Sequence, residues 1–165
     1  MTSEWAIICK LGGYVNSNPE ILSSYPDLEI SSDKSKELLS KCLPIGAKTG
    51  DFIMDKYDKY SVLSYVFKIP IQEDRDDLFS ISVLLAKKNN PEIYKPVLKK
   101  LINYLELNHI LSERVLMRYQ KAIYNGINEE KDIIIESIEI NLSKIFEDIK
   151  SKLIKPKPDV KGSFF

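Results

Sequence analysis

The chain reads GDFIMDKY over residues 50–57, YSVLSYVFKIP over 60–70, DLFSISVLLAKK over 77–88 and PEIYKPVLKKLINYLEL over 91–107. The first three segments are apolar, strand-like and separated by short polar loops. Parallel neighbours would need a crossover of about a dozen residues or more, so these strands are expected to pair antiparallel. The fourth segment has the apolar spacing of an amphipathic helix. The stretch therefore predicts a three-strand antiparallel meander that leads into a helix.

The two longer strands predict that helices cover both faces of the sheet. The strand over Tyr60–Ile69 carries apolar residues on both faces, with Leu63, Tyr65, Phe67 and Ile69 on one and Val62 and Val66 on the other. In the strand over Leu78–Ala86, large apolar residues alternate with Ser80 and Ser82. Because serine is small, a helix is able to approach that second face closely.

Capping signals place two helices on either side of the meander. Ser32 is a candidate N-cap for a helix over Asp33–Cys42, whose first turn contains an acidic residue. Asn90 followed by Pro91 predicts the start of the second helix, because proline in the first helical position loses no intrahelical hydrogen bond.

Weaker patterns supply the remaining elements. They are a strand over Trp5–Leu11, a short strand over Asp27–Ile30, a helix over Ser112–Tyr124 that ends at Asn125 and Gly126, and a long helix over Glu129–Leu153. The last helix has an alternating three-and-four spacing of apolar residues, at Ile135, Ile138, Leu142, Ile145 and Ile149. That spacing fits either packing on the chain's own domain, which we favour, or a coiled-coil contact with a partner helix.

These elements predict an α/β (α+β) sandwich with an antiparallel or mixed sheet of four to five strands, flanked by helices, and a long C-terminal helix. Residues 1–153 are expected to form a single domain with a C-terminal helical extension. The sequence after residue 153 is broken by prolines and rich in lysine, so residues 154–165 are expected to be a flexible tail.

The composition narrows the class of function. Twenty-four basic and 24 acidic residues cancel, which argues against a global field for nucleic acid, and Arg114, Arg118 and Lys121 fit a solvated helix face. No segment resembles a signal peptide or a membrane span, so a soluble, cytoplasmic protein is expected. Cys9 and Cys42 have no zinc spacing and are interpreted as buried small hydrophobes without a disulfide.

Catalytic and ligand-binding motifs are not found in the sequence. GAKTGD at residues 46–51 lacks the Gly-Lys step of a phosphate loop and precedes a strand. Asp51, Asp55 and the single histidine, His109, are the residues whose loss would test an enzymatic reading, but neighbouring turns and helix ends explain them. We therefore predict no catalytic residue, no cofactor and no metal site, and a protein that is not an enzyme.

The order of elements resembles the longin-domain superfamily, most closely the longin modules of DENN and folliculin-like proteins. The resemblance covers roughly Trp5 to Leu107 and rests on the strand order and on the turn Pro44-Ile45-Gly46 before the meander. The abundance of isoleucine, lysine and asparagine suggests an archaeal relative of these eukaryotic modules.

The resemblance implies a non-catalytic adaptor or regulator in vesicle trafficking or signalling. Its partner would be a small GTPase, another longin or roadblock subunit, or a second copy in a homodimer. The candidate interface residues lie on the first and last predicted helices: Leu38, Leu39, Ile135, Ile138, Leu142 and Ile145. Two alternatives stay open, a self-assembling structural subunit and a small-ligand sensor with a pocket between sheet and helices.

Overall fold

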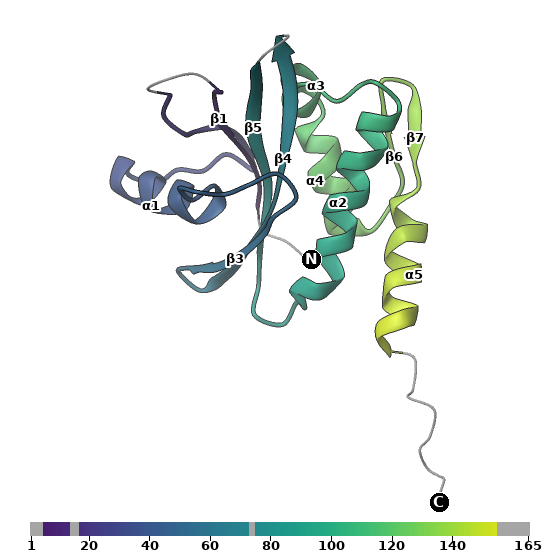
Figure 1. The fold of residues 1–165 in the computed structure, drawn as a ribbon. Helices are drawn as coiled ribbons and strands as arrows, with labels where there is room; N and C mark the ends of the chain where they lie inside the picture. The colour runs from purple at the N-terminus through teal and green to yellow at the C-terminus, as the bar shows by residue number, and fades with distance from the viewer. Residues whose placement is uncertain (1–4, 14–16, 73–74, 155–165) are drawn as a thin grey trace, which may run out of the picture.

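The predicted fold class is confirmed by the computed structural model, which describes residues 5–13, 17–72 and 75–154. Five strands form one antiparallel sheet in the order β2-β1-β5-β4-β3 (Figure 1). The strands are β1 (Trp5–Leu11), β2 (Glu20–Tyr25), β3 (Phe52–Tyr57), β4 (Tyr60–Gln72) and β5 (Arg75–Leu85). The β3-β4-β5 meander is the predicted one. Strand β5 is the central strand of the sheet, because it also pairs with β1 on its other side.

One face of the sheet is covered by α1 (Ser32–Cys42), which lies on the left in Figure 1. Ile7 and Cys9 of β1 and Val62 and Val66 of β4 point to this face, as their alternation predicts, and pack with Leu38 of the helix. Ser64 and Ser82 also lie on this side, joined through their hydroxyls at 2.6 Å. The N-cap of α1 is Ser31 rather than Ser32, because the Ser31 side chain accepts the amide of Lys34.

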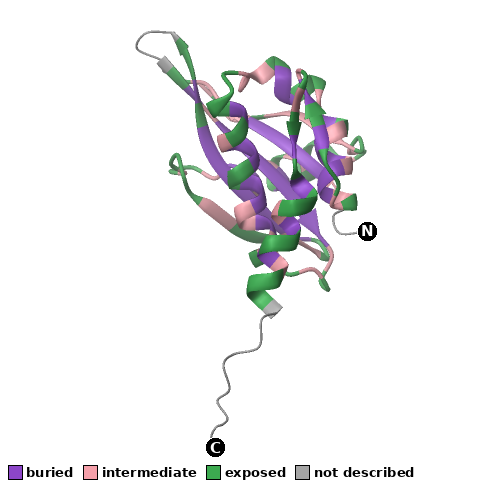
Figure 2. Cartoon of the chain, turned by 90° about the vertical axis from the view of Figure 1, so that its right-hand side faces the viewer, coloured by how far each residue is buried: buried purple, intermediate pink, exposed green. Residues whose placement is uncertain are grey.

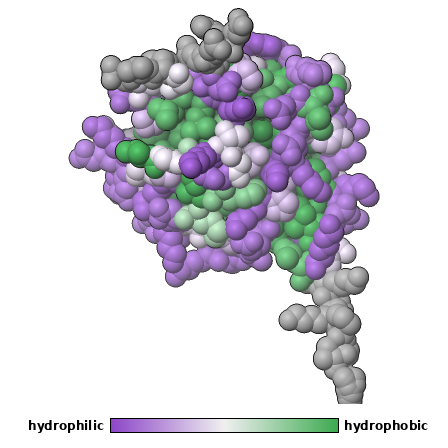
Figure 3. Space-filling view, in the orientation of Figure 1, coloured by the Kyte–Doolittle hydropathy of each residue, from purple (hydrophilic) through white to green (hydrophobic). Residues whose placement is uncertain are grey.

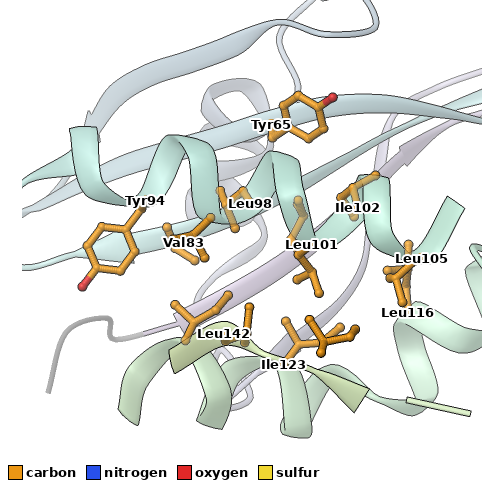
Figure 4. Close-up of a cluster of buried hydrophobic side chains, with 14 of the residues drawn as sticks. Tyr65, Val83, Tyr94, Leu98, Leu101, Ile102, Leu105, Leu116, Ile123 and Leu142 are labelled. Carbon is orange, nitrogen blue, oxygen red and sulfur yellow. The ribbon is translucent and has the colours of Figure 1, made fainter. Parts of the chain in front are cut away.

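The opposite face carries the larger core, beneath a layer of helices. These helices are α2 (Pro91–Leu107), α3 (Glu113–Arg118), α4 (Gln120–Glu129) and α5 (Leu142–Ile154). Figure 2 looks at this layer and shows the buried strands behind it. The apolar stripe of α2 meets β4 and β5 on one side and α4 and α5 on the other, as Figure 4 shows for Leu98, Leu101 and Ile123. Figure 3 shows that hydrophobic residues reach the front surface only as patches between polar ones.

The predicted helix over Glu129–Leu153 is wrong in its first half. Residues there form a small hairpin of β6 (Ile133–Ile135) and β7 (Ile138–Ile140), and only α5 is helical. Phe146 of α5 contacts Tyr94 of α2 edge to face, with ring centroids 5.7 Å apart. The C-terminal helix thus packs on its own chain, which confirms the intramolecular alternative over the coiled coil.

Three smaller predictions also differ from the structure. Residues 27–30 are irregular, and the second strand is β2. The predicted helix over Ser112–Tyr124 is interrupted at Tyr119, where the buried amide of Gln120 turns inward and donates to the carbonyl of Ala6 at 2.8 Å. The helix then continues through Gly126 to Glu129.

Cys9 and Cys42 are buried and free, as predicted.

Gly126 lies inside α4 because β6 crosses it closely. A Cβ added at this position would overlap Cγ2 of Ile133 and lie 2.9 Å from Cδ1 of Leu142. Glycine in a helix interior costs about 1 kcal/mol relative to alanine, so close packing and not helix propensity explains the residue.

We therefore expect Gly126→Ala to destabilise the protein by about 1–3 kcal/mol. Helix propensity alone predicts the opposite, a stabilisation, because alanine favours a helix more than glycine does. The overlap involves a β-branched side chain close to its backbone, which has little freedom to move. Urea unfolding of the variant measures the change. Asn125→Ala, on the same helix, is the control and is expected to change stability little, because Asn125 is only partly buried. Equal or higher stability of Gly126→Ala would show that β6 is free to move away.

Candidate partner-binding edge

Strand β3 forms an open edge of the sheet. It pairs with β4 on one side, and no strand of the described residues pairs with it on the other. A two-residue turn at Asp58 and Lys59 closes the hairpin, with Tyr57 opposite Tyr60. Open edges present unpaired backbone groups and are a common site for strand addition by a partner.

The register decides which backbone groups face outward. The amide of Val66 donates to the carbonyl of Asp51 at 2.9 Å, so Asp51 and every second residue after it bond to β4. The N–H and C=O groups of Phe52, Met54 and Lys56 therefore point to the open side. These alternate outward residues are enough to bond one short added strand.

Apolar side chains are exposed on the open edge and in the turn before it. The side chain of Met54 is 49% exposed on the α2 side of the edge, beside the partly buried Phe52. Ile45, in the turn Pro44-Ile45-Gly46 that follows α1, is fully exposed to solvent. Gly46 has a φ of +91°, so the turn holds Ile45 outward with a backbone that favours glycine. Exposed large hydrophobic residues are typical of a contact surface, and Met54 places one on the open edge.

The α1 side of the edge is more polar. Lys41 of α1 and Asp55 of β3 form an exposed ion pair at 3.4 Å. The backbone amide of Lys56, which donates to the Asp55 carboxylate, and then Lys41 lower the pKa of Asp55. Charges on an edge strand discourage indiscriminate pairing, so they favour a partner whose charges are complementary.

The six predicted interface residues fall on opposite sides of the sheet. Leu38 and Leu39 belong to α1, and the other four belong to the hairpin and α5 beneath α2. Leu38, Ile135 and Leu142 are fully buried in the chain's own core, whereas Leu39, Ile138 and Ile145 keep part of their surface. Of the six, Leu39 is the accessible residue on the helix beside the β3 edge.

The structure gives Asp51 and His109 roles in turns. Asp51 accepts the amide of Lys48 at 2.9 Å and so closes the turn before β3. His109 lies far along the chain at the end of α2, where its φ of +58° terminates the helix. Within the described ranges, no group of three or more His, Cys, Asp or Glu side chains is placed to hold a metal ion.

The sequence predicts only part of the β3 edge. The sequence predicts the turn Pro44-Ile45-Gly46 and the strand β3, but neither pattern shows that Ile45 and Met54 are exposed. Exposure depends on β3 being last in the sheet, which follows from the long-range pairing of β1 with β5.

Comparisons with known proteins give no family for this chain. No protein-family model matches it, and a search of curated proteins finds no match either. None of the helices in the described part of the chain combines the length and apolar character needed to cross a bilayer.

Proposed function

We propose that this chain is a non-catalytic, longin-like adaptor or regulatory module that binds a small GTPase or another longin or roadblock subunit. The observation that carries the proposal is the open β3 edge with Met54 exposed on it. The order of elements from β1 to α2, with the turn Pro44-Ile45-Gly46 before the meander, supports the longin resemblance.

Strand addition explains how such an edge binds. A partner strand laid along β3 satisfies the outward N–H and C=O groups of Phe52 and Met54, and main-chain hydrogen bonds then supply affinity. The outward amide of Lys56 already donates to the Asp55 carboxylate. Met54 on the edge and the exposed Ile45 in the turn before β3 supply apolar contacts that distinguish one partner from another. The partner belongs to trafficking- or signalling-type complexes in this proposal.

The proposal predicts binding that depends on the outward amide of residue 54. Proline is tolerated on an edge strand when its missing N–H faces solvent, so Met54→Pro removes a partner contact and no bond to β4. Met54→Ala is the matched control, because it removes only the side chain. Against small GTPases loaded with GDP or a non-hydrolysable GTP analogue, we expect a preference for one nucleotide. We expect at least a tenfold loss of affinity for Met54→Pro and a smaller loss for Met54→Ala.

The same variants separate the adaptor from a self-assembling subunit. If the edge binds a second copy, sedimentation shows a dimer that Met54→Pro converts to monomer, with no GTPase present. Partner binding that is unchanged in both Met54→Pro and Ile45→Asp would remove the β3 edge from the proposal. Substrate turnover that disappears on replacing Asp51, Asp55 or His109 would contradict the non-catalytic assignment.

A further inference from the structure

A cavity of about 430 Å³ lies at the end of the β3–β4 hairpin, on the α1 side of the sheet. It is bordered by the start of β1, the hairpin turn, the segment after β2 and the first turn of α1. Its walls are formed by Trp5, Tyr57, Tyr60, Leu28, Ile30 and Leu84, and its rim by charged residues. The volume falls in the range of small-molecule sites, roughly 300–1,000 Å³.

Two aromatic rings form a corner of this cavity. The rings of Trp5 and Tyr60 stand nearly perpendicular, at 79°, with centroids 5.4 Å apart. The ammonium of Lys59 lies 5.6 Å from the centroid of the Tyr60 ring, so one face of that ring already accepts a cation. Aromatic faces arranged as adjoining walls attract cations through the ring quadrupole.

One hydrogen-bonding group of the wall is buried without a partner. The indole N–H of Trp5 is buried and makes no hydrogen bond. Tyr57, whose side chain is only 8% exposed, also lines the cavity. Buried polar groups are normally paired, so the Trp5 end of the wall is a place where a hydrogen-bond partner is missing.

Three carboxylates and two ammonium groups line the cavity. Asp27, Glu29 and Asp58 line it together with Lys34 and Lys59. Among the described residues, none of the three carboxylates forms an ion pair. Burial, followed by the negative charges of Glu37 and Asp58, raises the pKa of Tyr57, which is consistent with a negative potential at the wall.

We propose that this cavity binds a small organic cation, an alkylated ammonium of about the size of choline. The charged head lies against Trp5, Tyr57 and Tyr60, and the carboxylates of Asp27, Glu29 and Asp58 balance its charge. This site does not depend on the adaptor function, because it lies at the hairpin end and its test uses no protein partner.

Isothermal titration of the full chain with choline and tetramethylammonium tests the proposal. The neutral 3,3-dimethylbutanol, which has nearly the shape of choline without the charge, is the ligand control. We expect saturable binding of both cations and at least tenfold weaker binding of the alcohol. Equal binding of the alcohol, or no saturable binding of either cation, would overturn the proposal.

Two pairs of variants test the walls and the rim. Tyr60→Phe keeps the aromatic face and is expected to bind choline as the parent does, whereas Tyr60→Leu is expected to bind about tenfold more weakly. Asp58→Asn removes a carboxylate but suits the φ of +56° at this turn, and is expected to weaken binding severalfold. The melting temperature of each variant shows that it is folded.

The variant Lys59→Gln distinguishes a cation site from an anion site by the direction in which choline affinity changes. The substitution removes the ammonium that lies over Tyr60, so an added cation meets less repulsion and an unoccupied ring face. We expect choline to bind several times more tightly to this variant. Weaker choline binding, or binding of acetate or phosphate to the parent that Lys59→Gln abolishes, would show that the cavity takes anions instead.

Discussion

A chain that ends after Glu129 is expected to lose its cooperative unfolding transition. The deletion removes β6, β7 and α5, which together bury six apolar side chains: Ile133, Ile135, Ile140, Leu142, Phe146 and Ile149. At about 1.5–3 kcal/mol for each buried side chain, the loss is about 10 kcal/mol or more, comparable to the whole stability of a domain. The stripe of α2 that faces α5 is also left exposed.

Near-ultraviolet circular dichroism, thermal melting and dye binding measure this result. The truncated chain should keep secondary structure while losing fixed aromatic packing, since the Tyr94–Phe146 contact is gone. A chain ending at Leu153 is the control, because it retains every one of the six side chains. A monomeric truncated chain that melts close to the intact protein would instead make the C-terminal segment an element for a partner.

The central sheet could be predicted because its strands carry complete local patterns. Val62 and Val66 lie on one face of β4 and Phe67 on the other, as alternation requires. Pro91 after Asn90 starts α2 at the expected residue. These signals are local, and the tertiary structure does not override them.

The C-terminal hairpin could not be predicted from apolar spacing alone. Isoleucines of β6 and β7 and the first residues of α5 together imitate a helical period, although Ile133–Ile135 is a β-branched run that favours a strand. The turn between the strands, Glu136 and Ser137, has positive φ at both residues without a glycine. Tyr119 donates to the Glu136 carboxylate at 2.8 Å, and Arg114 and Arg118 lie near it, so long-range contacts hold a turn with no sequence signature.

The candidate sites could not be predicted from the sequence, because they are formed by residues that only long-range structure brings together. The sequence predicts that Gly126 ends a helix, because a glycine that permits close packing has the same local appearance as one that ends a helix. Trp5 and Tyr60 are far apart in the sequence, and only the order of the strands brings their rings to one cavity. Local patterns therefore predict the strands of the meander and α2, whereas the surfaces depend on pairing between strands that are distant in the sequence.

Phe67→Ala is expected to lower the free energy of unfolding by about 3–5 kcal/mol. Phe67 is 3% exposed, and its ring stacks on Phe79 with centroids 5.8 Å apart, in a row of aromatic rings that crosses β3, β4 and β5. Close packing on all sides leaves little room for the cavity to collapse, so the cost should lie near the upper end of that range.

Ile81→Ala, at a fully buried position of β5, is expected to cost about 2–5 kcal/mol by the same mechanism. Met54→Ala is the control on the same sheet, and its exposed side chain predicts a change within about 0.5 kcal/mol. Urea unfolding curves of the three variants provide the comparison. Unchanged midpoints for both Phe67→Ala and Ile81→Ala would mean that these side chains face solvent. Because alternation ties each residue to its neighbours, β4 and β5 would then present their opposite faces to α2.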